Sequence, residues 1–300
     1  MNTGPGAIGI TSFSTSALPS SLRIDNETSA SFIQKIGTSA TYDGFTVNGP
    51  HYLIQGAKIE ASIDDYSSLP LVIRGSMIVV KSDAYWGIMG RAAAAPVYVL
   101  YSDISGLPGV SSGDLVWLNS SNSVAFRNHI HGISNHGLQV GGGAYNVQVL
   151  ENLIDHWTPA PGSHNDGIVM DGTARNVTIG RNKILLNVPE TGAINVGGWV
   201  GKTTSLIMDS NYIAGGGYTL YGPGAAGNSF TNNVFGFDQY PNVGRWGLVY
   251  PGSWASSDPW INNRTADGKS VSYTGAVSAV EAPILRSEVC GQPLDPAQRH

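Results

Sequence analysis

Five of the seven histidines lie close together in the sequence: His129, His131, His136, His156 and His164. Residues 134–137 (SNHG) align with residues 164–167 (HNDG), so His136 would lie beside Asp166 if the two segments stack. A carboxylate next to an imidazole raises the histidine pKa and fixes its tautomer, which suits a general acid or base. We therefore predict a site whose candidate catalytic residues are His136, His164 and Asp166.

Polar and aromatic residues near this cluster could hold a substrate. Arg181 and Lys183 could neutralise a sugar carboxylate, and Trp157 could stack on a sugar ring. The candidate substrate-binding residues are Asn135, Asn165, Asp171, Trp157, Arg181 and Lys183. An alternative interpretation is structural, because Asp and Asn before Gly are common turn residues and a histidine there can simply hydrogen-bond a backbone carbonyl.

No cofactor and no metal site are predicted. The five histidines do not have metal-ligand spacing on a helix, and the single cysteine, Cys290, excludes an intramolecular disulfide and a cysteine-based zinc cluster. A Ca²⁺ site that uses Asp155, Asp166 or Asp171 is the alternative.

A repeat of short strands must position these residues. Residues 146–154 (NVQVLENLI), 176–184 (NVTIGRNKI) and 205–213 (SLIMDSNYI) have apolar residues at the second, fourth and ninth positions and Asn at the seventh. Alternation with a period of two predicts a strand with one buried face. Because each repeat also carries a second strand, usually opened by Gly, the pattern predicts a parallel β-helix. Val147, Val177 and Leu206 should form one internal column, Ile154, Ile184 and Ile213 another, and structural corners are expected at Asn128, Asn152, Asn182 and Asn211.

Composition agrees with an all-β chain of many tight turns, since only 12% of the 300 residues are charged and 39 are Gly. The net charge of −5 does not indicate binding to nucleic acid. The sequence contains no apolar run of about eighteen residues, so no membrane-spanning segment is predicted. We predict a flexible arm or linker over 1–20, a β-helix over 21–240, an aromatic C-terminal cap over 241–275 and an extended tail over 276–300. The aromatic rings of the cap could close the rod or stack on sugars.

The run 121–235 resembles the right-handed parallel β-helix of the pectate-lyase-like superfamily. Its segments HNDGI (164–168), NVTIGRNKI (176–184) and AGGGYTLYG (214–222), continued by YPNVGRWG (240–247), are similar to actinobacterial β-helix proteins and to minor tail proteins of phages that infect actinobacteria. The resemblance implies a single-stranded right-handed β-helix of about eight coils with an aromatic-rich C-terminal cap. The superfamily includes polysaccharide lyases, hydrolases, epimerases and non-catalytic binders, so the resemblance leaves the activity open.

Three functions are compatible with these features. The first is a tailspike-like minor tail protein of a phage virion, which contacts or processes a cell-surface glycan, binds other phage tail proteins and forms a homo-oligomer, with a trimer as the leading expectation. The absence of a signal peptide before Arg23 favours this location in the virion tail. The alternatives are a secreted, extracellular polysaccharide lyase or hydrolase and a structural β-helix without catalysis.

Overall fold

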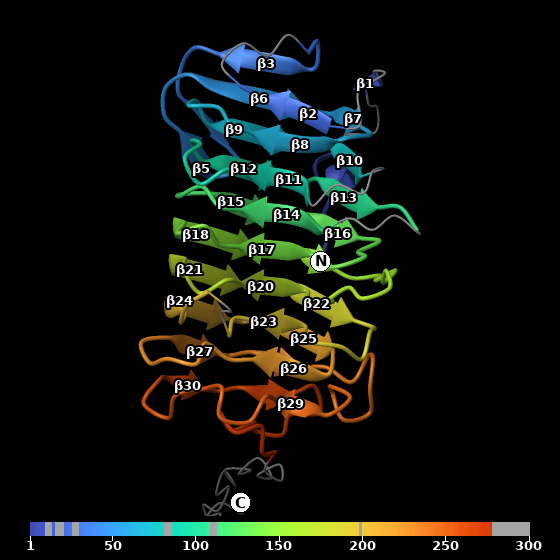
Figure 1. Cartoon of the computed structure of the whole chain (residues 1–300), viewed down its shortest axis with the longest axis vertical. Helices are drawn as coiled ribbons and strands as arrows, with labels where there is room; N and C mark the ends of the chain where they lie inside the picture. The colour runs from blue at the N-terminus through green and yellow to red at the C-terminus, as the bar shows by residue number, and fades with distance from the viewer. Residues whose placement is uncertain are drawn as a thin grey trace, which may run out of the picture.

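The alternating segments form short strands that return to the same three sheets, turn after turn. The computed structural model describes residues 1–9, 14–15, 21–25, 30–80, 86–108, 113–197 and 200–277. Within these residues the chain runs repeatedly through sheet C, then sheet A, then sheet B, and eight such turns follow each other from β6–β7–β8 to β27–β28–β29. Neighbouring turns pair in parallel, which confirms the predicted right-handed parallel β-helix (Figure 1).

The strand bounds follow the repeat. Sheet A contains, in spatial order, β1 (Ser14–Thr15), β7 (Ala57–Ile59), β10 (Met77–Val80), β13 (Asp103–Gly106), β16 (His129–His131), β19 (Leu153–Ile154), β22 (Lys183–Leu186), β25 (Tyr212–Gly215), β28 (Val234–Phe235) and β31 (Arg264–Thr265). Sheet B contains β2 (Ser21–Ile24), β8 (Ser62–Asp65), β11 (Trp86–Gly90), β14 (Asp114–Leu118), β17 (Leu138–Val140), β20 (Ile168–Met170), β23 (Ile194–Asn195), β26 (Tyr218–Tyr221) and β29 (Gly247–Val249). Sheet C contains β3 (Ile33–Ile36), β6 (His51–Gln55), β9 (Leu71–Arg74), β12 (Val97–Leu100), β15 (Val124–Phe126), β18 (Tyr145–Leu150), β21 (Arg175–Gly180), β24 (Thr204–Asp209), β27 (Ser229–Thr231) and β30 (Trp260–Ile261).

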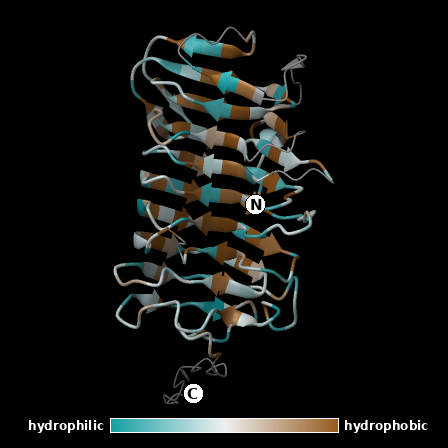
Figure 2. Ribbon diagram, in the orientation of Figure 1, coloured by the Kyte–Doolittle hydropathy of each residue, from teal (hydrophilic) through white to brown (hydrophobic). Residues whose placement is uncertain are grey.

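Apolar side chains of equivalent positions form continuous columns inside the rod. The first predicted column is confirmed by strand register and burial: Val147, Val177 and Leu206. The second is confirmed in the same way: Ile154, Ile184 and Ile213. Figure 2 shows the result, since hydrophobic segments recur on strand after strand of each sheet. Burial of these columns is the main favourable contribution to folding.

Buried asparagines stack at the corner between sheets C and A. In each step of the ladder the amide oxygen of one Asn accepts hydrogen bonds from the backbone N–H and the side-chain amide of the Asn one turn earlier. The corner role is confirmed, and the ladder extends further than predicted: Asn128, Asn152, Asn182, Asn211, Asn233 and Asn263. The left-handed backbone lies one residue earlier, at Glu151 (φ 57°) and Arg181 (φ 54°) for example, so the Asn itself supplies hydrogen bonds rather than conformational freedom.

The described part of the N-terminal segment packs on the rod. The 3₁₀ helix η1 (Pro5–Ile8) lies beside the middle turns, where the Gly4 N–H donates to the Arg127 carbonyl at 2.9 Å. Strand β1 then pairs with β7, and β3 pairs with β6 in the antiparallel direction. An antiparallel hairpin, β4 (Ala40–Tyr42) and β5 (Phe45–Val47), follows β3. The rest of the predicted arm, residues 10–13 and 16–20, lies outside the described residues.

The rod continues beyond residue 240, because β29, β30 and β31 add to all three sheets. Trp254 and Trp260 contact Phe230, with ring centroids 5.2 and 4.4 Å away, and they cover the end of the hydrophobic core. Tyr250 and Trp246 instead lie exposed on sheet B. Residues 278–300, most of the predicted tail, lie outside the described part of the chain. Within that part, no helix has the length and apolar character needed to cross a membrane.

Candidate functional site

The register of sheet B places His136 beside Asp166, as the sequence alignment predicted. Strands β17 and β20 pair Leu138 with Ile168, so the residues two positions earlier also align. The His136 Nδ1 lies 3.3 Å from the Asp166 Oδ2, while the Asp166 Oδ1 accepts a hydrogen bond from the Gly192 N–H at 3.0 Å. The carboxylate is thus fixed by the next turn of the rod and can hold the imidazole in one orientation.

His136 and Asp166 each precede a glycine that faces the hydrophobic core. A Cβ added to Gly137 or Gly167 would collide with core isoleucines, so these two glycines face the interior. His136 and Asp166 precede β17 and β20, and Asp166 lies near Tyr221 at the surface of sheet B, since its charge contributes to the raised pKa of that tyrosine. Both side chains are largely buried: His136 is 9% exposed and Asp166 is 2% exposed. His136 therefore offers a narrow edge to a ligand.

A third member of the site, Asp114, was missed in the sequence. Asp114 begins β14, one turn before His136, and is buried. With the Gln139 amide oriented to satisfy both neighbours, its nitrogen donates to the Asp114 Oδ2 at 2.6 Å and its oxygen accepts from the Trp117 Nε1 at 3.2 Å. Strand register pairs Trp117 with Gln139 directly. Asp114, His136 and Asp166 thus form a row across three successive turns, which we call the sheet B triad.

Burial and charge perturb the protonation of this triad. Burial raises the pKa of Asp114 to about 7; the positive charge of His136 opposes this shift and the negative charge of Asp166 adds to it. Burial lowers the pKa of His136, but the hydrogen bond to Asp166 and the charges of both carboxylates outweigh it, and the pKa lies above the ordinary value. The triad can therefore hold protons near neutral pH, which suits a proton donor.

Aromatic rings flank the triad along the rod. On the N-terminal side, the Trp86 and Trp117 ring centroids lie 6.2 Å apart, and the Arg91 guanidinium carbon is 4.6 Å from the Trp86 centroid. On the C-terminal side lies a group that we call the aromatic patch: Tyr218, Tyr221, Trp246 and Tyr250. The sequence repeat could have predicted that Tyr221 lies on the same face of sheet B as Trp117, because strand pairing connects Trp117, Gln139 and Tyr221 in one row.

The aromatic patch is accessible and adjoins a cavity. The Tyr221 and Tyr250 rings stack at 4.9 Å with 18° between their planes, and Tyr218 contacts Trp246 edge-on at 5.9 Å. Trp246 also lines a cavity of about 460 Å³ together with Phe237, Asn242 and Lys269. Burial first, and the charge of Asp166 second, raise the pKa of Tyr221, which indicates that the patch borders the triad. Exposed rings next to a cavity of this size are typical of ligand sites.

Three further predicted residues lie close to the triad in the chain and in the fold. The Asn135 Oδ1 accepts a hydrogen bond from the backbone N–H of His164 at 2.9 Å, which joins the two loops. The His164 side chain is exposed. Asn165 is buried against Ser163, and its carbonyl accepts a hydrogen bond from the Thr191 hydroxyl at 2.6 Å, so it joins its loop to the next turn of the rod.

Four other predicted residues do not join the site. Trp157 forms a parallel β-bridge with Ile133 of the preceding turn. Its side chain is buried in the hydrophobic core, so it presents no ring face to a ligand. Arg181 forms an ion pair with Glu151 at 2.9 Å at the corner between sheets C and A, and Lys183 lies on sheet A over Tyr212. Asp171 follows the opposite end of β20 and accepts hydrogen bonds from Thr173 and from the backbone of Gly142.

The three carboxylates considered for Ca²⁺ have separate protein partners. Asp155 contacts His129 and His156, whereas Asp166 contacts His136 and Asp171 contacts Thr173. They lie on two different sheets and at opposite ends of β20. Their arrangement therefore does not form the single cluster of oxygen ligands that Ca²⁺ requires.

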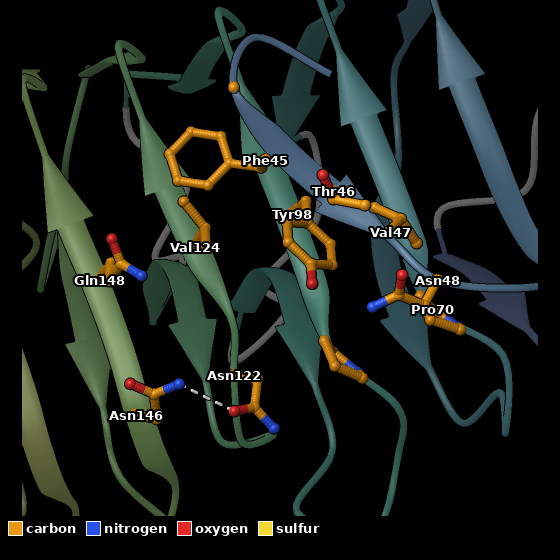
Figure 3. Close-up of a pocket in the computed structure, with 12 residues that line it drawn as sticks. Phe45, Thr46, Val47, Asn48, Pro70, Tyr98, Asn122, Val124, Asn146 and Gln148 are labelled. Atoms are coloured by element: carbon orange, nitrogen blue, oxygen red, sulfur yellow. Dashed lines mark hydrogen bonds between the residues drawn. The ribbon is translucent and has the colours of Figure 1, made fainter. Parts of the chain in front are cut away.

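A second hollow lies on the outer face of sheet C, under the hairpin β4–β5 (Figure 3). This groove of about 490 Å³ is lined by the amides of Asn48, Asn122, Asn146 and Gln148 and by the rings of Phe45 and Tyr98. Asn146 donates a hydrogen bond to Asn122 at 2.9 Å. Its lining contains no carboxylate, histidine, lysine or arginine, so the groove suits an uncharged polar ligand and lacks groups for acid–base chemistry.

Comparison with known proteins adds no family to this description. The chain matches no protein-family model, no curated protein and no solved structure.

Proposed function

We propose that this protein binds a glycan on the outer side of sheet B, with sugar rings stacked on the aromatic patch. The observation that carries the proposal is the placement of four clustered aromatic rings, including the exposed Trp246 and Tyr250, next to a cavity and to the sheet B triad. Saccharides present apolar ring faces and polar edges. A site with aromatic platforms and convergent polar groups matches both surfaces.

A pair of matched tyrosine substitutions tests the binding site. Tyr250 of the patch and Tyr145 on sheet C are 46% and 56% exposed, so Tyr250→Ala and Tyr145→Ala remove the same side chain from two exposed positions. Because an aromatic contact contributes about 0.5–1.5 kcal/mol, Tyr250→Ala should weaken glycan binding roughly 2- to 13-fold. Calorimetric titration with a panel of bacterial cell-surface polysaccharides measures this change. Equal binding by the two variants would refute the assignment.

The sheet B triad favours a second activity, cleavage of the bound glycan by hydrolysis. In this proposal the His136 imidazolium donates its proton to the leaving glycosidic oxygen while water attacks the anomeric carbon. The neutral imidazole then accepts the proton that the water loses, so His136 is restored and the products are an alcohol and a hemiacetal. Asp166 and Asp114 keep the imidazole charged and oriented, which is the role their contacts suggest.

A reducing-end assay separates an enzyme from a binder. His136→Gln should abolish the release of reducing ends but leave binding to the aromatic patch within about twofold. Release of unsaturated uronates instead would identify a lyase. If wild-type protein binds a glycan from the panel and releases neither product, cleavage is refuted while binding stands.

We further propose that the glycan belongs to a bacterial cell surface and that the protein meets it as part of a phage tail, as a homo-oligomer and most simply a trimer. The resemblance of residues 121–247 to minor tail proteins supports this setting. Light scattering of the protein, alone and with tail proteins of the same genome, distinguishes a trimer from the 31.5 kDa monomer. Persistent monomer in both samples would favour the secreted enzyme.

A further inference from the structure

A second group of histidines and carboxylates lies on sheet A, away from the sheet B triad. Strands β13 and β16 pair Asp103 with His129 and Ser105 with His131. Because Ile104 and Ile130, the residues between them, are fully buried, all four flanking side chains face outward. Both histidines thus project from the outer face of the rod toward the carboxylate of Asp103.

The donor atoms of these three side chains converge. The His131 Nε2 lies 3.0 Å from the Asp103 Oδ1, and the His129 Nδ1 lies 3.5 Å from the Asp103 Oδ2. The two imidazole rings stack with centroids 4.2 Å apart and 23° between their planes. One ligand atom from each of the three residues lies within 4.8 Å of the other two.

The separation of 3.5 Å matches the edge of a tetrahedral metal site, and that of 3.0 Å is slightly shorter. Zn²⁺ binds imidazole nitrogen and carboxylate oxygen at about 2.0–2.2 Å, which places two ligand atoms of a tetrahedron roughly 3.3–3.6 Å apart. The 3.5 Å between the His129 Nδ1 and the Asp103 Oδ2 falls within this range, whereas the His131 Nε2 lies 3.0 Å from the other oxygen, Oδ1, so an ion held by one oxygen requires a shift of His131. Two imidazoles and one carboxylate are also a common protein ligand set for Zn²⁺, with a fourth position left for water.

The remaining nitrogen of His129 is held by a second carboxylate. The His129 Nε2 and the Asp155 Oδ1 form a hydrogen bond of 2.9 Å, and the His156 Nδ1 lies 2.7 Å from the same oxygen. Metal-binding histidines almost always donate their other N–H to a carboxylate, a carbonyl or water, which fixes the tautomer and orients the ring. Asp155 therefore stands where such an orienting residue is expected.

An ion can reach this group from solvent. The side chains of Asp103, His129 and His131 are 23–30% exposed, in contrast to the buried triad on sheet B. Gly4 of the N-terminal segment passes close by: a Cβ at this position would lie 3.9 Å from the Asp103 Oδ2. The group therefore lies where two turns of the rod meet the N-terminal segment.

We propose that Asp103, His129 and His131 bind a divalent transition-metal ion of the Zn²⁺ type, with Asp155 as the residue that positions His129. The ion ties β13 to β16 beside the N-terminal segment and stabilises that part of the rod. This site is independent of the glycan site on sheet B.

Zinc titration of the full chain tests the proposal. After dialysis against EDTA, calorimetric titration with ZnCl₂ should show one ion per chain, and bound Zn²⁺ should raise the unfolding temperature. His131→Ala removes a ligand and should weaken binding at least about 100-fold, and Asp155→Asn should weaken it about 10- to 100-fold by loosening His129. The control is His164→Ala, which removes an exposed histidine outside the group and should bind as wild type.

Cobalt supplies a readout that does not depend on stability. Co²⁺ in place of Zn²⁺ should give the intense visible absorption of a tetrahedral site in the wild type and in His164→Ala, and lose it in His131→Ala. Circular dichroism confirms that each variant is folded. The proposal is overturned if wild-type protein retains no Zn²⁺ after gel filtration, or if folded His131→Ala binds Zn²⁺ as tightly as the wild type.

Discussion

The asparagine ladder carries a stability that can be measured at one residue. The Asn182 Oδ1 accepts hydrogen bonds from the backbone N–H and the Nδ2 of Asn152, both at 2.9 Å. Its own Nδ2 donates to the Val149 carbonyl at 2.9 Å and to the Asn211 Oδ1 at 3.0 Å. Asn182→Ala therefore leaves two buried backbone groups, the Asn152 N–H and the Val149 carbonyl, without these partners.

The expected loss follows from the cost of unpaired buried groups. Each such group costs about 1–3 kcal/mol, so Asn182→Ala should lower the free energy of unfolding by about 2–6 kcal/mol. Asn242→Ala is the matched control, because Asn242 is exposed and its substitution should change stability by less than about 0.5 kcal/mol.

Asn182→Ser provides a finer test, because serine already occupies the ladder in an earlier turn. The Ser102 hydroxyl accepts a hydrogen bond from the Ser76 N–H at 3.2 Å and donates to the Leu100 carbonyl at 3.0 Å. A serine at position 182 can accept a hydrogen bond from the Asn152 N–H, but its hydroxyl would donate to the Gly180 carbonyl and not to that of Val149, so its loss should be about half that of alanine.

Guanidinium denaturation followed by circular dichroism measures these differences, and hydrogen exchange locates them. Since 1.4 kcal/mol corresponds to a factor of ten, the Asn152 amide should exchange at least about 30-fold faster in Asn182→Ala. If Asn182→Ala and Asn242→Ala unfold at the same denaturant concentration, the ladder does not contribute as argued.

Three other substitutions probe the core, a corner and a buried acid. Ile179→Asp should prevent folding, seen as loss of the β-sheet circular dichroism signal, because an unpaired charge at this fully buried position costs several kcal/mol. Gly215→Ala should destabilise far more than Gly143→Ala in thermal denaturation, since both glycines have positive φ but only at Gly215 would the Cβ lie 1.8 Å from a backbone oxygen, that of Leu186. Burial raises the pKa of Asp65 to about 7 from an unfolded value of 3.8. The folded state thus retains a proton that the unfolded state has released, and stability falls as pH rises from about 4 through 7. Asp65→Asn should therefore exceed the wild type in stability at pH 8, with a difference that shrinks toward pH 4; a constant difference would contradict the assignment.

The parts of the fold that the sequence predicted are those set by the repeat. Once Asn152 and Asn182 are aligned, every strand position between them acquires a partner one turn away. This is why the buried columns and the contact between His136 and Asp166 were predictable. The alignment of Ser102 with Asn128 of the next turn puts Asp103 beside His129, a pairing that the sequence analysis did not use.

The parts that the sequence did not predict depend on positions outside the repeat. Trp157 follows a short strand, and only the bridge to Ile133 in the folded rod shows that its ring turns inward. Asp114 belongs to a turn in which the second strand was not recognised, so its place beside His136 was missed. Arg181 and Lys183 are near Asp166 in the sequence but not in the fold. They lie at the corner between β21 and β22, on the side of sheets C and A, whereas the triad lies on sheet B.

The two polar groups of this protein have the same order of residue types across the same three turns. On sheet A, His129 lies between Asp103 and Asp155, and on sheet B, His136 lies between Asp114 and Asp166. Adjacent turns are about 4.8 Å apart, so the two carboxylates of each group are about twice that distance apart, and an imidazole in the turn between them offsets their repulsion.

Exposure then separates the chemistry of the two groups. The sheet B triad is 2–9% exposed, so a proton is the species that it can exchange readily, and burial moves the pKa of Asp114 to about 7. On sheet A, a second imidazole, that of His131, faces Asp103, and the side chains remain 23–30% exposed. A hydrated metal ion can enter that group and replace the protons between its ligands. One arrangement of side chains, repeated on two sheets, thus fits the proposed proton transfer where it is buried and the proposed metal binding where it is more exposed.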